Sequence, residues 1–477
     1  MEQLEELETS PQGERSNAVL TDTCNDFVNI ITTNKFCSMK KFVLFATTII
    51  LSIVACSDYE SMGIGNVKET QETQSPNRSI DEAMQIVQSS IKMLEDNAVT
   101  RSTSQRKIDL NKTKVCKLNS RTRSGEYRTD TLMYVFNFAD NEGFAIIAAP
   151  KNVNALLAIT ESGNYDFDQP TEVEGFKLFV EMAKKYVERE MQANRFPPFY
   201  PPVKDTVTTL ISSKNPLVTV KWGQAFPEGL YCPNTVCGCA NTAAIQIFSY
   251  YEYPTYVNLT FSQRERDNIS INWIELKKHY RGCNSYASHT NCLATVDAHK
   301  SIGELARQCA VYANSKFYVS SIEISDTASL PYSYTNYVSW TTSTTYTYES
   351  GVVDMIEVMG YTRPTFSNYY SKCTQTPLNS NKPIFMGGQG VYGGHAWVVD
   401  GYKYYEDVIT DHNTEPATVT TSYRYYNHVN WGWYGNSDGY YLDGIFDANN
   451  AYSYDNPSYG SSYYSFPDTL RFAPIEL

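Results

Sequence analysis

Four closely spaced prolines divide this chain into two parts, in the run FPPFYPPVKD at residues 196–205. Each proline fixes its own φ and lacks a backbone N–H, so the run ends the helix predicted before it and forms an extended connector. At 477 residues the chain is also longer than one ordinary domain. We therefore expect two folded units, separated by a connector at residues 196–214 whose exposed backbone is open to proteolysis.

The smaller unit, residues 79–195, is predicted to be a compact α+β domain. Ser79 and Glu82 have the S-x-x-E spacing of a helix capping box, and apolar residues follow at helical spacing. Residues 132–149 have the pattern of a β-hairpin. The segment EGFKLFVEMAKKYVEREM then predicts an amphipathic helix. We find no candidate catalytic constellation in this unit.

The composition is that of a globular protein and excludes one class of partner. Hydrophobic residues make up 42% of the chain and charged residues 19%, as in folded domains. The formal net charge of −13 argues against nucleic acid, because binding to phosphates requires clustered Lys and Arg. The 38 tyrosines are concentrated after Tyr312, which indicates a Tyr-rich β surface or a binding surface.

A short apolar segment near the start has the features of an export signal. Residues 39–41, MKK, form a basic head, and the apolar run of residues 42–55 follows. That run is shorter than the roughly 20 residues that a membrane-spanning helix requires. It ends in IVAC, which resembles a bacterial lipobox with Cys56 as the lipidated residue. A plain signal peptide followed by an incidental cysteine is the alternative.

The signal defines the organisation of the N-terminal region. Residues 39–56 are predicted to be a lipoprotein signal peptide, and the polar residues 57–78 a tether. Residues 1–38 precede the signal, and we expect them to come from a translation start assigned too far upstream. The protein is therefore expected to be exported, and either held to a membrane by acyl chains, at the outer membrane or cell surface, or secreted.

Two cysteines stand close together in the segment VCGCANTAAIQIF. A zinc site needs about four clustered ligands, and no second CxxC or nearby His completes a set with Cys232, Cys237 and Cys239. A redox pair would favour C-x-x-C spacing. Disulfides are permitted in an exported protein, and Cys232–Cys237 and Cys283–Cys292 are the candidate pairs. No metal or organic cofactor is expected.

Cys239 differs from the other cysteines in its position. It follows Gly238 and begins a segment with helical spacing, and the N-terminus of a helix favours a thiolate. Gly238 permits a tight turn and leaves room for a substrate carbonyl, so it is a candidate for the substrate wall. A nucleophilic cysteine also requires a base, which must come from a histidine elsewhere.

His395 is the candidate base. In GVYGGHAWVVDGY it follows two glycines and opens an apolar strand. The second glycine, Gly394, leaves a path to the ring and is a further candidate for the substrate wall. A histidine at the start of a strand is more often structural. However, an upstream Cys and a downstream His follow the order of papain-like peptidases. The other five histidines are predicted to be surface residues: His279, His289, His299, His412 and His428.

Four segments in this part of the chain resemble the streptopain family of cysteine peptidases. GCANTAAIQIFSYYEYP resembles the nucleophile segment of the family, and GGHAWVVDGY its histidine segment. HVNWGWYGNSDGYYLD resembles its third conserved block, and VKWGQAFPEGLYCP the region of its oxyanion-hole glutamine. Upstream, YVFNFADNEGFAIIAAP and LLAITESGNYD resemble the family's inhibitory propeptide. The resemblance covers most of the chain after Arg78.

The resemblance implies a catalytic set. Cys239 would be the nucleophile, and His395 the general base and later the general acid. Gln224 would donate a side-chain N–H to the developing oxyanion, together with the backbone N–H of Cys239. Either Asn430 or its neighbour Trp431 would orient and shield the imidazole.

The resemblance also implies a fold and a mode of action. Residues 215–477 would form a papain-like α+β peptidase domain, with a helical part carrying Cys239 and an antiparallel sheet carrying His395. Residues 79–195 would be an inhibitory propeptide, removed by cleavage in the connector. The expected function is a secreted cysteine endopeptidase, made as a zymogen, that hydrolyses protein or peptide substrates through a thioester.

Two Tyr-rich segments, residues 311–350 and 444–466, depart from the family pattern and leave the substrate specificity open. They also suggest an alternative function. The chain could be a surface lipoprotein that has lost catalysis and binds host protein or glycan through these segments. The completeness of the catalytic set favours the enzyme.

Overall fold

The computed structural model describes most of the chain from residue 75 onward. The described ranges are 75–95, 106–121, 127–169, 171–193, 204–262, 264–280, 292–324, 343–390, 393–412, 415–446 and 470–477. The predicted signal peptide with Cys56, all four prolines of the connector, and residues 325–342 and 447–466 of the Tyr-rich segments lie outside them. All described residues belong to one compact body, Glu72–Leu477. The N-terminal and C-terminal units described below are its two parts. None of the described helices has the length and apolarity needed to cross a membrane.

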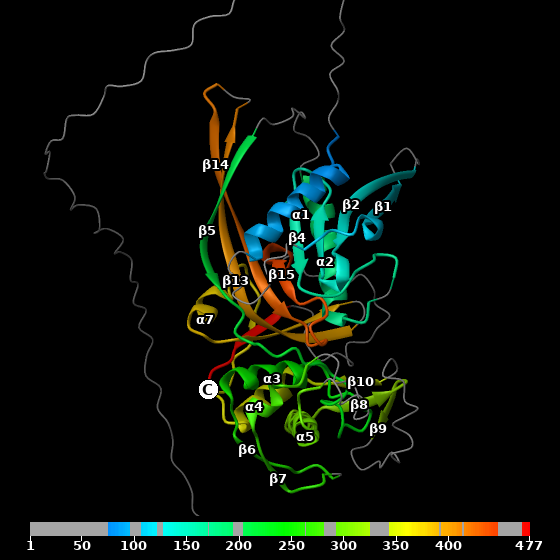
Figure 1. The fold of residues 1–477 in the computed structure, drawn as a ribbon, viewed down its shortest axis with the longest axis vertical. Helices are drawn as coiled ribbons and strands as arrows, with labels where there is room; N and C mark the ends of the chain where they lie inside the picture. Colours follow the sequence, from blue (N-terminus) through cyan, green and yellow to red (C-terminus); the bar gives the residue numbers. More distant parts are fainter. Residues whose placement is uncertain are drawn as a thin grey trace, which may run out of the picture. The chain divides into compact units, whose positions relative to one another are not determined.

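The N-terminal unit, residues 75–193, is an antiparallel sheet with two helices (Figure 1). Its strands pair in sequence order: β1 (Lys114–Arg121), β2 (Tyr127–Asn137), β3 (Phe144–Ala148) and β4 (Leu156–Thr160). The helices are α1 (Ile80–Glu95) and α2 (Glu174–Ala193), with the short 3-10 turns η1 (Leu110–Lys112) and η2 (Ala139–Asn141). The predicted hairpin and amphipathic helix are confirmed. The capping box is confirmed as well. The backbone N–H of Ser79 donates to the Glu82 carboxylate at 2.7 Å, and the backbone N–H of Glu82 donates to the Ser79 hydroxyl at 3.1 Å.

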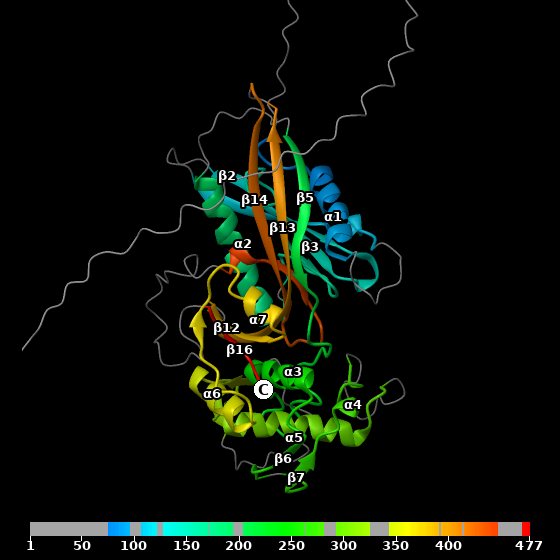
Figure 2. The ribbon, with the colours of Figure 1, turned by 90° about the vertical axis from the view of Figure 1, so that its left-hand side faces the viewer.

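The C-terminal unit, residues 204–477, contains a helical part and a sheet. Its helices are α3 (Cys239–Tyr251), α4 (Trp273–Leu276), α5 (Val296–Tyr312) and α6 (Glu349–Val358). Two small sheets accompany them, made of β6 (Tyr256–Asn258) with β7 (Asn268–Ser270), and of β8 (Lys316–Val319), β9 (Ile322–Ile324) and β10 (Ser343–Tyr346). Figure 2 shows α3 and α5 side by side, and both supply residues to one hydrophobic core.

The second part of this unit is an antiparallel sheet. Its strands are β5 (Lys204–Lys214), β11 (Ser367–Asn368), β12 (Ile384–Gly390), β13 (Gly393–Asp411), β14 (Thr418–Asn430), β15 (Gly439–Leu442) and β16 (Arg471–Pro474). The short helices α7 (Gln375–Asn379) and η5 (Asp443–Ile445) accompany them. The expected division into a helical part with Cys239 and a sheet with His395 is therefore confirmed.

The sheets of the two units are continuous. Strand β4 pairs with β15 in antiparallel register, with Thr160 opposite Gly439 and Ala158 opposite Tyr441. Helix α2 packs on the same region, where the ring of Phe179 meets that of Tyr441 at a centroid distance of 4.7 Å. One hydrophobic core therefore runs from the N-terminal unit into the C-terminal sheet, and it fixes the position of α2.

The second half of the predicted connector at residues 196–214 is extended as expected, but it is a strand of the sheet and not an unpaired linker. Residues 204–214 form β5, which pairs with β13 from Lys204 opposite Asp411 to Lys214 opposite Tyr402. The side chains of β5 are largely exposed, so the expected exposure holds. However, a strand whose backbone is hydrogen-bonded to its neighbour is a poor protease substrate.

Candidate active site

Cys239 is the first residue of α3 and follows the helix N-cap, Gly238. Gly238 has φ +92°, and a Cβ there would come within 3.0 Å of Thr345, so this turn requires glycine. Residues 240–249 of α3 are all buried, whereas Cys239 keeps part of its surface exposed. The sulfur therefore stands at the positive end of a rigid helix and remains accessible, as a nucleophile must.

The neighbouring cysteines are chemically different from Cys239. Cys232 and Cys237 are both free thiols, so the candidate disulfide between them is not formed. Burial raises the pKa of Cys237 well above its ordinary value and raises that of Cys232 to about 12. Their thiols are therefore unreactive at neutral pH. Cys292 is in a disulfide, and its predicted partner, Cys283, lies outside the described residues.

His395 lies at the start of β13, directly after the partly exposed Gly394, and is only 1% exposed. Its Nε2 is 3.0 Å from the backbone carbonyl oxygen of Trp431. Because a carbonyl can only accept, Nε2 must carry the proton of this hydrogen bond. The other ring nitrogen, Nδ1, is then the one that exchanges a proton, and Cys239 lies close enough to act on the charge of the ring.

Trp431, and not Asn430, contacts the imidazole. The side chain of Asn430 donates to the Val220 carbonyl at 3.0 Å and accepts from the Gly432 backbone N–H at 3.0 Å. It therefore shapes the turn that follows β14. Trp431 is fully buried, and its indole N–H donates to the Tyr441 hydroxyl at 3.0 Å. Of the two expected alternatives, the Trp431 carbonyl orients the ring.

Gln224 lies on the loop that precedes α3 in the chain. Its backbone carbonyl accepts from the N–H of Cys237 at 2.8 Å, which ties this loop to the turn before Cys239. Its side-chain Nε2 is buried and has no hydrogen-bond partner among the described residues. Leaving a buried donor unsatisfied is costly, and such groups commonly serve a ligand or a reaction. This donor is free to bind an oxygen that arrives with a substrate.

The prediction of surface positions was wrong for three other histidines. His279, His299 and His428 are each at most 5% exposed. His428 lies 2.6 Å from the buried carboxylate of Asp400. Sequence could not show these positions, because the residues that bury the rings lie far away in the chain. His412 is exposed as predicted, and His289 lies outside the described residues.

Comparison with known proteins identifies both units. Residues 220–441 match the family model described as the Peptidase C10 family, and residues 69–187 match that of the Spi protease inhibitor. Residues 220–441 therefore form a peptidase domain of the C10 family. The chain is a cysteine peptidase with an α+β peptidase domain, preceded by a smaller α+β propeptide domain.

The C10 peptidase has curated relatives in Streptococcus pyogenes. Streptopain of serotype M28 is 22% identical over 345 residues, which cover 66% of this chain and 74% of the relative. Streptopain of serotype M1 is 22% identical over 346 residues, with the same coverage. Among solved structures, a fragment of prointerpain A from Prevotella intermedia is 18% identical and aligns with a TM-score of 0.45. The alignment covers 75% of this chain and 98% of the fragment.

The propeptide of this C10 peptidase contacts His395 through the first turn of α2. A carboxylate oxygen of Glu174 lies 3.7 Å from Nδ1 of the ring. A Cβ added to Gly175 would overlap both the His395 ring and the Trp431 indole, so the helix backbone lies against both rings. Burial would lower the pKa of His395, but Cys239 and Glu174 outweigh it and raise the pKa to about 10. Cys239 and Glu174 therefore favour the charged form of the imidazole in the zymogen.

A second group of charges joins the propeptide to the peptidase domain. A Glu161 carboxylate oxygen lies 3.3 Å from His428 Nε2, and the other lies 2.7 Å from Lys221 Nζ. Burial would raise the pKa of Glu161, but His428 and Lys221 hold it well below its ordinary value. Burial would lower the pKa of His428, but Asp400 and Glu161 raise it to about 10. The two units are therefore joined by a partly buried group of ion pairs.

Glu161 should make the zymogen sensitive to acid. Because its pKa is lower in the folded state than in the unfolded chain, its stabilisation is present above the ordinary carboxyl pKa and is lost as pH falls below it. We expect Glu161→Gln to reduce the loss of stability between about pH 5 and about pH 2, measured as urea midpoints of the Cys239→Ala zymogen. The matched control is Glu172→Gln, at an exposed carboxylate of the same unit. An equal acid effect in both variants would contradict the assignment.

The propeptide residues at the active site carried no local signal. Glu174 and Gly175 stand at the start of a predicted amphipathic helix, where an acidic residue is common for reasons of helix dipole alone. Glu161 belongs to LLAITESGNYD, a segment that resembles the family propeptide but contains no catalytic pattern. Only the pairing of β4 with β15 and the packing of α2 bring these residues to the site.

Proposed function

We propose that this C10 peptidase is an exported, lipid-anchored endopeptidase that is held inactive by its own propeptide and acts through a Cys239 thioester. One observation carries the catalytic part of the proposal. Cys239, at the N-terminus of α3, lies beside His395, whose Nε2 is fixed on the Trp431 carbonyl. This leaves Nδ1 to exchange a proton with the thiol.

Each step of the reaction has a residue in position. Once the propeptide has left, His395 Nδ1 takes the proton of Cys239, and the thiolate attacks the substrate carbonyl. The developing oxyanion accepts from Gln224 Nε2 and from the backbone N–H of Cys239. His395 then protonates the leaving amine, which releases the first product and leaves a thioester. Water activated by the same imidazole hydrolyses the thioester and restores the thiol.

The contacts of Glu174 and Gly175 support inhibition within the molecule. Glu174 places a negative charge beside the imidazole, and the Gly175 backbone occupies the space next to the rings of His395 and Trp431. A substrate cannot reach the ring while α2 is there. The continuous sheet of β4 and β15 holds α2 in that position.

Activation then requires a cut between the two units. Residues 204–214 are hydrogen-bonded to β13, so we place the cut before Lys204, in the proline-containing part of the connector.

The location of the protein is part of the same proposal. Export and lipidation at Cys56 are supported by the basic head, the short apolar run and the IVAC tetrad of the sequence.

Autoprocessing is the test of the proposed function. The zymogen is prepared with Cys239 intact and as Cys239→Ala, and both are incubated in a thiol reductant with casein. We expect only the intact form to shorten, to a fragment whose N-terminus lies before residue 204, and then to digest casein. Intact mass spectrometry follows the cut, and gel analysis follows the casein.

A second arm separates failed activation from a lack of activity. If neither form shortens, a trace of an outside protease is used to cut the connector. A trimmed protein that neither digests casein nor reacts with a thiol-directed probe at Cys239 would contradict the proposal. Cys237→Ala is the control for the thiol, because that residue is fully buried and we expect it to leave processing unchanged.

A further inference from the structure

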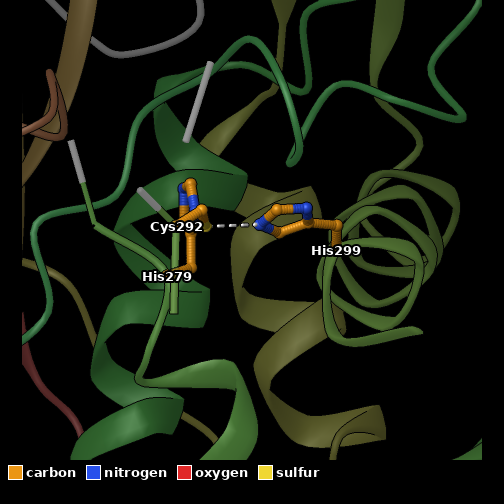
Figure 3. Close-up of side chains that lie close together, drawn as sticks. All are labelled: His279, Cys292 and His299. Carbon is orange, nitrogen blue, oxygen red and sulfur yellow. Dashed lines mark hydrogen bonds between the residues drawn. The ribbon is translucent and has the colours of Figure 1, made fainter. Parts of the chain in front are cut away.

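Three side chains of types that can ligate a metal lie together in the helical part of the peptidase domain. Figure 3 shows His279, Cys292 and His299 converging from three segments of the chain. One donor atom of each lies within 4.8 Å of the others, and Cys292 Sγ is 3.4 Å from His299 Nε2. The rings of His279 and His299 are nearly perpendicular, with centroids 5.3 Å apart. Two imidazoles and a sulfur at this spacing are donors that zinc prefers.

Two buried groups at this cluster lack hydrogen-bond partners among the described residues, the His279 ring and one oxygen of Glu228. His279 is 3% exposed, and neither of its ring nitrogens has a hydrogen-bond partner among the described residues. Glu228 is fully buried, and its Oε2 likewise has none among them. Its Oε1 lies 3.5 Å from His279 Nε2. Buried imidazoles and carboxylates without hydrogen bonds are costly, so this arrangement requires a further partner.

We propose that His279, His299 and Cys292 form a zinc site that opens for metal when the disulfide at Cys292 is reduced. In the disulfide the sulfur carries no charge and is a poor ligand, whereas a thiolate binds zinc strongly. Two equivalents of a small thiol reduce the disulfide and form their own. The Cys292 thiol then releases its proton to solvent as the sulfur binds the metal.

Glu228 has the position of the carboxylate that commonly supports a metal-bound histidine. Such a carboxylate accepts from the ring nitrogen that does not bind the metal, and it fixes the tautomer and the orientation of the ring. The contact between Glu228 and His279 fits this role. With three protein donors, the fourth tetrahedral position is left for water or another ligand.

The site would join three parts of the domain. His299 lies on α5, His279 follows α4, and Glu228 lies on the loop that also carries Gln224. Glu228 Oε1 also accepts from the backbone N–H of Gly223, at 3.4 Å. Metal binding under reducing conditions would therefore hold the Gln224 loop against α5. The same reducing conditions keep Cys239 as a free thiol.

The test is zinc binding by the Cys239→Ala zymogen, because this variant neither processes itself nor offers the catalytic thiol as a ligand. The protein is stripped of metal and titrated with zinc against a chromophoric chelator, with and without a phosphine reductant. We expect one zinc per chain after reduction and none before it. Cobalt in place of zinc should give the absorption of a tetrahedral site with a sulfur-to-cobalt charge-transfer band.

Variants then assign the ligands. We expect His279→Asn, His299→Asn and Cys292→Ser each to weaken zinc binding more than Glu228→Gln, which should cost about 10- to 100-fold in affinity. His412→Asn is the matched control at an exposed histidine and should change nothing. No zinc binding after reduction, or a cobalt spectrum without the sulfur band, would overturn the site without requiring any variant. Equal binding before and after reduction would overturn the role of the disulfide.

Discussion

Replacing Gln224 by alanine is expected to lower kcat of the mature peptidase by about 10²–10³-fold, with little change in KM. The buried Nε2 has no hydrogen-bond partner among the described residues, so it is available to an oxyanion without breaking another bond. Its backbone is held separately, through the bond from the Cys237 N–H. The side chain can therefore be removed while the loop keeps its anchor. Steady-state kinetics with a fluorogenic peptide provide the measurement.

Two further measurements distinguish a lost oxyanion donor from a damaged fold. Gln375→Ala is the control, because that amide donates to Ser212 of β5 and has no expected role in the reaction. The thiol-directed probe should still label Cys239 in Gln224→Ala, since an alkylating reaction develops no oxyanion. An unchanged kcat would remove Gln224 from the mechanism. A loss of labelling together with kcat would indicate disruption of the loop.

Local elements of the fold could be predicted because their causes are local. The capping box of Ser79 and Glu82 joins residues three apart, and the helix that begins at Cys239 follows a glycine that permits the turn. The roles expected for Cys239 and His395 came from the resemblance of their segments to one family. The structure adds that helix α3, which carries Cys239, packs against strand β13, which carries His395.

Contacts between distant segments could not be predicted. The pairing of β4 with β15 depends on register between residues far apart in sequence, and no composition encodes it. The buried state of His428 follows from Asp400 and Glu161, which belong to two different units. A polar neighbourhood in sequence indicated a surface, but a polar neighbourhood in space proved to be a buried ion pair.

Strand β5 is a different case, because its signal was present in the sequence. The segment TVTT at residues 206–209 is rich in β-branched residues, which favour strands. The prolines before it prevent a helix. However, they do not prevent a strand that begins after the last of them.

Replacing Gly175 by alanine is expected to weaken the inhibition of the zymogen by about 5- to 150-fold, which corresponds to the roughly 1–3 kcal/mol that overpacking costs. The new methyl group would overlap the rings of His395 and Trp431, which are both buried and cannot move aside freely. In an isolated helix the same change would be favourable, by about 1 kcal/mol. Any loss of inhibition would therefore result from the overlap with the active-site rings, and not from a lower stability of helix α2. Labelling of Cys239 by the thiol-directed probe before any cleavage measures this effect.

The chain offers a matched control in Gly444, where an added Cβ meets none of the described residues within 4 Å. Gly444→Ala also adds one methyl group to a glycine, but in the peptidase domain, and it should leave labelling of the zymogen unchanged. Glu174→Gln separates charge from shape, since it removes the negative charge near Nδ1 but keeps the size of the side chain. It should lower the pKa of His395 in the zymogen from about 10 without creating the overlap. If Gly175→Ala labels no faster than Gly444→Ala, then α2 does not control access to Cys239, and the inhibition must come from another part of the propeptide.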